Sequence, residues 1–129
     1  MPWSLEYWKP SDSNTSPVKK ELEKEIKGNS QAKINFYTMV TTLENLGPHD
    51  FISPKNKSLG GGLFELRDTS NGKRYYYCET NIKSANEKLV LLLGAVGSKN
   101  NASEQNRDIK LARERLASIN EQNILLEGN

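Results

Sequence analysis

Residues 63–93 read LFELRDTSNGKRYYYCETNIKSANEKLVLLL, and this stretch decides the fold class. Its apolar and aromatic runs predict strands over 63–67, 74–80 and 88–93. The Asn-Gly pair at 71–72 lies between the first two runs and is typical of a tight hairpin turn. Three successive strands with short links predict an antiparallel meander.

The sequence before this stretch predicts one strand and a helical hairpin. Alternating apolar residues predict a short strand over 3–7. Ser16 followed by proline is typical of a helix start, and an apolar residue at every fourth position continues this helix to a Gly-Asn pair. Ser30 is a potential N-cap for a second helix over 31–46, which the Gly-Pro pair at 47–48 ends. The tight break between the two helices predicts an antiparallel hairpin.

The remaining segments are interpreted as loops, apart from one last helix. Residues 49–62 and 94–102 contain glycines and polar residues without an apolar period, which predicts loops. Ser103 is a potential N-cap for the last helix, whose apolar face points inward. We expect one domain over 1–119, ending with this helix, and a flexible tail over 120–129.

The composition fits a globular domain with a weak positive charge. The chain has 129 residues, with 18 Lys and Arg against 16 Asp and Glu, which gives a formal net charge of +2. This balance permits nucleic-acid binding without demanding it. The longest apolar run, 89–93, is too short to cross a bilayer, and the first residues lack the pattern of a secretory signal. We therefore expect a cytoplasmic protein that does not contact a membrane.

The numbers of cysteines and histidines limit the nucleophilic and zinc chemistry that this chain can perform. Cys78 is the only cysteine and His49 the only histidine, which excludes an intramolecular disulfide and leaves no usual zinc ligand set. A nucleophile–base pair would require these two side chains to meet. We expect Cys78 to be a small buried residue in mid-strand and His49 to be a solvated loop residue. The residues alone therefore predict no metal site and no histidine-based catalytic site.

The cationic residues of the predicted meander are the informative feature. Because side chains alternate along a strand, Arg67 lies on one face of its strand, and Arg74 and Tyr76 share one face of the next. If the residues of the other parity face the helices, these three side chains share the open face of the sheet. Lys99, in the loop after the third strand, can reach the same surface. The residues expected to face the helices are Phe64, Leu66, Tyr75 and Tyr77.

Two interpretations of this face follow from the residues. Guanidinium groups, an ammonium group and a phenol suit a phosphodiester backbone and a base. The alternative is a solvated sheet face on which Arg67 and Arg74 pair with Glu65 and Glu79.

Several segments resemble the phage-derived, HigB-like toxins of the RelE superfamily. Residues 59–67, LGGGLFELR, resemble the LGdGLyELR signature of that family, and residues 72–77, GKRYYY, are similar to its strand that carries an arginine and a tyrosine. Residues 88–93 resemble the strand that follows, and residues 109–115, IKLARER, resemble the helix after it. The similarity covers residues 5–118, nearly the whole predicted domain.

The resemblance implies both a fold and an activity. The fold is α+β and RelE-like: an N-terminal strand and a helical hairpin pack on one face of a mostly antiparallel sheet, with a C-terminal helix. The function is that of the toxin in a type II toxin–antitoxin system, which is inhibited by a cognate antitoxin protein and cleaves mRNA on the ribosome. Family members need no metal and no other cofactor, because the 2′-hydroxyl of the RNA attacks the adjacent phosphate. The protein places the RNA in line and neutralises the charge that develops.

The resemblance also implies roles for single residues. Arg67 and Arg74 match the two sheet arginines of the family and are expected to bind phosphate and to stabilise the transition state. Lys99 falls near the second lysine of the family's active-site loop. Tyr76 is expected either to supply a stacking ring or a proton, or to be a packed sheet residue. Lys73 is expected to bind RNA, as are the two arginines.

The segment before Lys99 departs from the family pattern. Gly94, Val96 and Ser98 stand where the family has a histidine, an aromatic residue and a first lysine. These differences remove a base-stacking ring and one cation. The alternative function is therefore a non-catalytic module that binds RNA or an antitoxin, and a third is a purely structural interaction domain.

Overall fold

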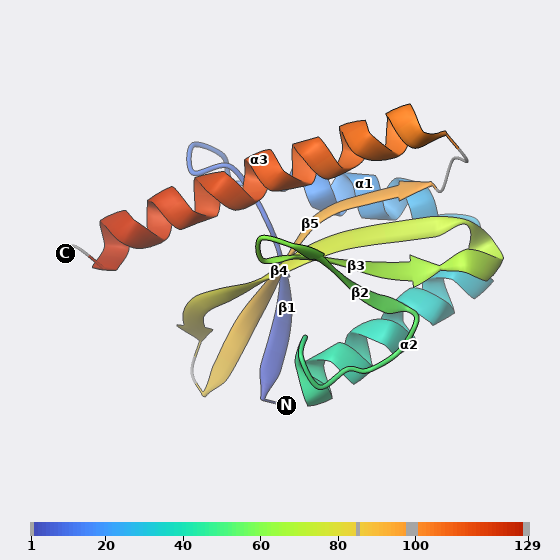
Figure 1. Cartoon of the computed structure of the whole chain (residues 1–129), viewed down its shortest axis with the longest axis horizontal. Coiled ribbons are helices and arrows are strands. Elements are labelled where there is room, and N and C mark those ends of the chain that lie inside the picture. Colours follow the sequence, from blue (N-terminus) through green and yellow to red (C-terminus); the bar gives the residue numbers. More distant parts are fainter. Residues whose placement is uncertain (1, 85, 98–100, 128–129) are drawn as a thin grey trace.

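The chain folds around one five-stranded sheet that has helices on both faces (Figure 1). This computed structural model describes residues 2–84, 86–97 and 101–127, and in the last helix it describes side chains as far as residue 119. The elements in chain order are β1 (Trp3–Tyr7), α1 (Pro17–Ile26), α2 (Ser30–Leu46), β2 (Asn56–Gly60), β3 (Leu63–Asp68), a 3-10 turn (Thr69–Asn71), β4 (Lys73–Ser84), β5 (Glu87–Gly97) and α3 (Ala102–Glu127).

The strands are arranged in the order β1-β5-β4-β3-β2. β1 pairs in parallel with β5, and the other neighbouring pairs are antiparallel. The predicted meander is therefore confirmed for β3, β4 and β5. It is extended by β2 at one edge, while β1 at the other edge ties the N-terminal segment to the last strand. The class is α+β with a mostly antiparallel sheet and a C-terminal helix, as predicted.

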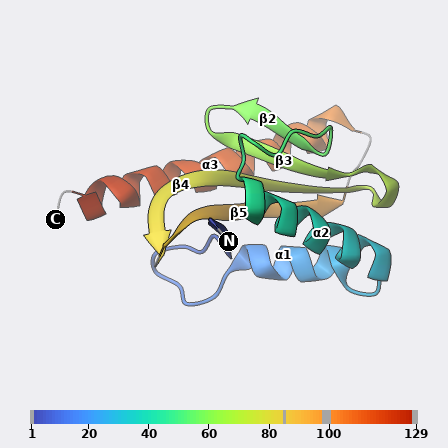
Figure 2. The ribbon, with the colours of Figure 1, turned by 90° about the horizontal axis from the view of Figure 1, so that it is seen from below.

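The helical hairpin covers one face of the sheet, as Figure 2 shows. Val18, Leu22 and Ile26 of α1 form the predicted apolar stripe, and all three are buried. The predicted strand parity is also confirmed, because every residue expected to face the helices belongs to the buried cluster on this side. Burying one such large side chain stabilises a fold by about 1.5–3 kcal/mol. This cluster is the larger of the two apolar cores among the described residues. Its sheet residues are Phe64, Leu66, Tyr75, Tyr77, Val90, Leu92 and Ala95.

The opposite face is not open, which corrects the expectation from the sequence. α3 crosses it and packs Ala112, Leu116 and Ile119 against the sheet. A helix with an apolar stripe needs an apolar surface to bury it, and this face of the sheet supplies one. The sheet residues beneath α3 are Leu63, Tyr76, Cys78 and Leu93.

Two arginines fasten α3 to the rest of the fold. Arg113 donates to the carbonyl oxygens of the last two residues of β2, at 2.9 and 3.0 Å. Arg115 is buried and donates to the carbonyl oxygen of Leu93 at 2.8 Å and to both carboxylate oxygens of Glu21 at 2.8 and 3.0 Å. Arg115 therefore joins α3 to β5 and to α1.

Several element boundaries differ from the prediction. The segment 49–62, expected to be a loop, contains β2, which pairs with β3. The expected loop over 94–102 begins with the end of β5, which β4 pairs as far as Gly97. These residues lack the apolar alternation of a half-buried strand, and it is the neighbouring strand that makes them part of the sheet. α3 also continues past residue 119, so the helix includes most of the expected tail over 120–129.

One predicted helix cap is confirmed. The other two caps lie one or two residues before the predicted residue. The side chain of Ser16 accepts a hydrogen bond from a backbone amide in the first turn of α1, as expected. α2 is capped by Asn29 rather than by Ser30. At the start of α3, the side chain of Asn101 accepts the backbone N–H of Ser103, so Asn101 takes the role expected of Ser103. Asparagine and serine are almost equally good caps, so propensity alone cannot choose between neighbours.

Gly47 ends α2 against β1 and gives a test of the packing between them. Its φ of 81° and ψ of 168° lie in a region that only glycine adopts readily, and a Cβ there would lie 2.4 Å from Nε1 of Trp3. We expect Gly47→Ala to lower the free energy of unfolding by at least about 2 kcal/mol, measured by urea denaturation.

Gly28→Ala is the matched control for this variant. Gly28 also has a positive φ, of 72°, but a Cβ there would meet no atom within 4 Å. Its substitution should cost only the backbone strain, about 1 kcal/mol. Equal losses for the two variants would contradict the contact between Gly47 and Trp3.

Candidate functional site

Arg67 and Arg74 lie side by side on the face of the sheet that α3 partly covers. They are direct cross-strand partners in the pairing of β3 with β4, and their parity places them opposite the helical hairpin. Their side chains keep 29% and 22% of their surface exposed. The structure therefore brings together the two arginines that the sequence singled out.

A buried carboxylate lies between the two guanidinium groups. Glu65 is fully buried, and its Oε1 accepts a hydrogen bond from Nε of Arg67. Its Oε2 lies 3.5 Å from Nη1 of Arg74, a contact that is an ion pair without a hydrogen bond. Both of these atoms are buried and without a hydrogen-bond partner among the described residues. The expected pairing of the arginines with Glu65 is therefore present.

Glu79 does not take part in this cluster. Its carboxylate lies 3.1 Å from Nε2 of His49 instead. The three formal charges of Glu65, Arg67 and Arg74 sum to +1, and the negative charge of Asp108 also acts on the neighbouring Tyr76. A buried carboxylate is tolerated because the two guanidinium groups offset its desolvation.

Tyr76 lies directly opposite Glu65 in the register of β3 and β4, but it is only 1% exposed. Burial, together with the negative charge of Glu65, raises the pKa of Tyr76 to about 12, although the charge of Arg74 acts in the opposite direction. The hydroxyl is thus protonated at neutral pH and cannot act as a base. Its ring packs beneath α3, so the structure favours the packed sheet residue over the stacking ring.

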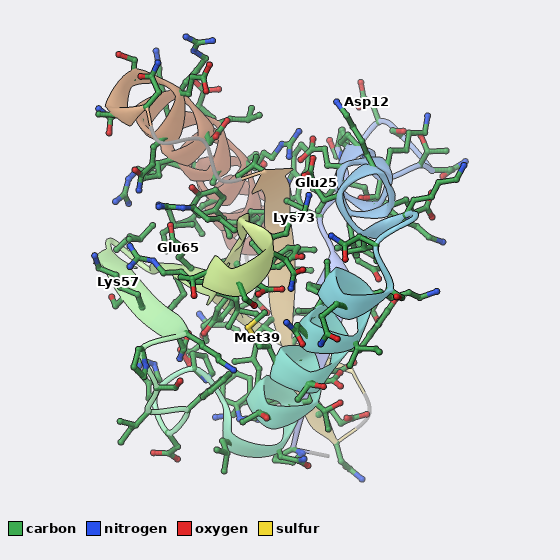
Figure 3. All side chains as sticks on the ribbon, turned by 90° about the vertical axis from the view of Figure 1, so that its right-hand side faces the viewer. Asp12, Glu25, Met39, Lys57, Glu65 and Lys73 are labelled. Carbon is green, nitrogen blue, oxygen red and sulfur yellow. The ribbon has the colours of Figure 1, made fainter. Side chains whose placement is uncertain are left out.

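Lys57 belongs to the same face and was missed by the sequence analysis. It pairs with Glu65 in the register of β2 with β3, so the two side chains share one face, and Lys57 is exposed. Figure 3 shows Lys57 and Glu65 on the side of the sheet away from α1. The signal was available: a run of glycines can close a hairpin, which would make the residues before it a strand.

Lys73, which was predicted to bind RNA, does not join the two arginines. Its side chain points to the other face, where its Nζ lies 3.0 Å from Oε1 of Glu25 in α1 (Figure 3). Lys73 and Arg74 are neighbours in β4, and neighbours in a strand point to opposite faces. Lys99, the fourth predicted catalytic residue, lies outside the described residues.

Cys78 and His49 do not meet. Cys78 is fully buried beneath α3, as predicted, and burial raises its pKa to about 12, so the thiol is unreactive at neutral pH. His49 is exposed as predicted, and its ring packs edge-on against Phe64 on the side of the helical hairpin. The two side chains are therefore on opposite faces of the sheet.

Searches for other kinds of site and for relatives found no further assignment. Within residues 2–84, 86–97 and 101–127, no group of three or more His, Cys, Asp or Glu side chains is placed to hold a metal ion. Over the same residues, no helix combines the length and the apolar character needed to cross a membrane. No protein-family model matches the chain, and no curated protein matches it either.

Two tyrosines of β4, Tyr75 and Tyr77, give a test of the hydrogen bonding on the face of the sheet opposite the arginines. The hydroxyl of Tyr77 donates to Oδ1 of Asn56 at 2.6 Å, whereas the buried hydroxyl of Tyr75 has no partner among the described residues. Tyr77→Phe should lower the free energy of unfolding by about 1–2 kcal/mol, because it leaves the Asn56 oxygen unpaired. Tyr75→Phe should change it by less than about 0.5 kcal/mol or raise it. Urea denaturation at pH 7 measures both, and a larger loss for Tyr75→Phe would contradict this assignment.

Proposed function

We propose that the chain is the toxin of a type II toxin–antitoxin system, a HigB-like member of the RelE superfamily with the fold of that superfamily. It cleaves mRNA on the ribosome in the cytoplasm, without a metal or other cofactor, and a cognate antitoxin inhibits it. The observation that carries this proposal is the pair formed by Arg67 and Arg74, which are cross-strand neighbours with partly exposed side chains.

The spacing of these groups fits a single phosphate. Directly opposed residues of an antiparallel pair have Cβ atoms about 4.5–5.5 Å apart, so two arginines there can grip the oxygens of one phosphate together. Arginine is well suited to this task because its planar group offers several N–H donors at fixed angles. The rigid sheet sets the distance between the two groups before any RNA binds.

The reaction requires the protein only to position the RNA and to stabilise negative charge. The 2′-hydroxyl oxygen of one nucleotide forms a bond to the adjacent phosphorus, and the bond to the 5′-oxygen of the next nucleotide breaks. The products are a 2′,3′-cyclic phosphate and a 5′-hydroxyl, and the proton lost by the 2′-oxygen balances the one gained by the 5′-oxygen. Arg67 and Arg74 stabilise the additional negative charge on the phosphorus oxygens in the transition state.

A second function is supported by what β5 contributes to this face. Its residues Gly94 and Val96 lie beside Tyr76 and Arg74 in the register, so β5 supplies no acid or base at these positions. Tyr76 itself is buried and protonated. The second candidate is therefore a module that binds RNA or an antitoxin without cutting. It predicts RNA binding that weakens with salt and that leaves the strand intact.

Removing either arginine tests the leading proposal. We expect Arg67→Ala and Arg74→Ala each to slow mRNA cleavage by about 10²–10³-fold, which is typical for the loss of one transition-state donor. The measurement is mapping of cleavage sites during translation in a reconstituted system.

Arg107→Ala is the control, because this arginine is exposed on α3 and does not belong to the cluster. All variants are first compared by circular dichroism and urea denaturation, because replacing Arg67 or Arg74 removes one ion-pair partner of the buried Glu65 carboxylate. If the wild type does not cleave mRNA, the proposal of a nuclease is wrong and the non-catalytic binding module is favoured.

Two lysines give a matched test of which face binds RNA. Lys57 shares the face of the arginines, and Lys73 lies on the other face. Lys57→Ala should weaken binding of single-stranded RNA several-fold and make the slope of log K against log salt concentration shallower by about 0.7. Lys73→Ala should leave affinity and slope unchanged and lower only the stability, because it removes the ion pair with Glu25. The opposite result, measured by fluorescence anisotropy, would place the RNA on the face of the helical hairpin.

A further inference from the structure

Glu65 is an unusual residue to find between two groups that are to bind a phosphate. It is fully buried, and it is ion-paired with both arginines of the site. The phosphate that those arginines are proposed to bind carries the same charge as this carboxylate. The role of Glu65 therefore has to be explained together with that of the arginines.

The backbone fixes where the carboxylate lies. Glu65 precedes Arg67 by two residues in β3, so the two share a face, and it lies diagonally across from Arg74 in β4. Like charges placed directly opposite each other across a sheet repel, and long side chains that repel point apart. A carboxylate on the same face attracts both guanidinium groups and keeps them together.

The hydrogen bonds of this cluster are incomplete. Glu65 uses the Nε–H of Arg67, which leaves the four N–H groups on the Nη atoms of Arg67 unused by the carboxylate. Toward Arg74, the contact of 3.5 Å is an ion pair without a hydrogen bond, and both of its atoms are buried without another partner. Buried polar atoms without partners are rare in folded proteins, and they mark places where something other than stability is served.

We propose that Glu65 is a positioning residue that presents Arg67 and Arg74 to the RNA and also competes with the RNA phosphate for their N–H groups. This inference rests on the proposed function, because it concerns the same site. In the free protein the carboxylate holds the guanidinium groups side by side. When RNA binds, the phosphate engages the unused Nη groups of Arg67 and competes with Glu65 for Arg74, whose side chain is 22% exposed.

This double role separates binding from cleavage. Removing the negative charge leaves two uncompensated arginines, which should bind a phosphate chain more tightly and release more counterions. The same change frees the guanidinium groups to adopt other orientations, and transition-state stabilisation depends on orientation. A residue that only stabilised the fold would weaken binding and cleavage together.

Glu65→Gln tests the proposal, because glutamine keeps the shape of the side chain and loses its charge. The matched control is Glu79→Gln, which removes a carboxylate from β4 that lies near His49 and outside the cluster. Binding is measured with a fluorescent single-stranded RNA that carries 2′-O-methyl groups, so that it cannot be cut, between 50 and 300 mM KCl. Cleavage is measured with the unmodified RNA, and kcat and KM are determined separately.

We expect Glu65→Gln to bind the 2′-O-methyl RNA at least about threefold more tightly and with a salt slope steeper by about 0.7. We also expect its kcat to fall at least about tenfold while KM falls, with Glu79→Gln unchanged in all four quantities. Unchanged or weaker binding by Glu65→Gln would overturn the competition, and an unchanged kcat would overturn the positioning role. If the wild type binds RNA without cutting it, the nuclease proposal fails and the positioning role fails with it. In that case, the RNA affinity and salt slope of Glu65→Gln still test whether Glu65 competes with the RNA phosphate.

A second measurement uses the unaltered chain and so does not depend on how well the variant folds. The side-chain Nε–H of Arg67, held by Glu65, should give a distinct signal in ¹⁵N NMR spectra of the wild type. Adding the 2′-O-methyl RNA should shift this signal and those of both guanidinium groups. Signals of the Arg67 and Arg74 Nη groups that do not move while the RNA binds would overturn the proposed exchange.

Discussion

The antiparallel pairing of β3 with β4 is the constraint on which the rest of this structure depends. Along both strands, residues of one parity supply aromatic and aliphatic side chains to the core beneath the helical hairpin. Residues of the other parity are then committed to the second face. The register places Arg67 directly opposite Arg74, and no local adjustment can separate them without moving core residues. The site is therefore built into the same hydrogen bonds that hold the sheet together.

The second face of the sheet is divided between packing and charge. Toward one end, α3 buries Leu63, Cys78 and Leu93 beneath its apolar stripe. Toward the other end, Arg67 and Arg74 remain partly exposed around Glu65. Tyr76 lies at the boundary, since its ring packs with α3 while the charge of Glu65 raises its pKa. The helix that stabilises this face also limits how much of it can contact a ligand.

Much of the fold could be predicted because its signals are local. The period of two in 63–67 and 74–80, the Asn-Gly turn, and the fourfold spacing in α1 each appear within a short window. β2 and the end of β5 lack this apolar period; only the glycine run after β2 indicates a hairpin there, and both segments become strands because a neighbour pairs with them. Because β2 was not predicted, Lys57 was not recognised as part of the face of the arginines.

The sequence by itself determined that Arg74 and Tyr76 share a face, because side chains alternate along a strand, and it predicted Arg67 on that face on the condition that the other parity faces the helices. It also determined that the chain holds one cysteine and one histidine, which leaves few routes to nucleophilic catalysis. Only the tertiary structure decided that α3 covers Tyr76 and that a buried Glu65 lies between the arginines. Burial and ion pairing depend on which distant segments come together. For example, α3, with residues 112–119, contacts residues 59–60 of β2 only in the folded chain.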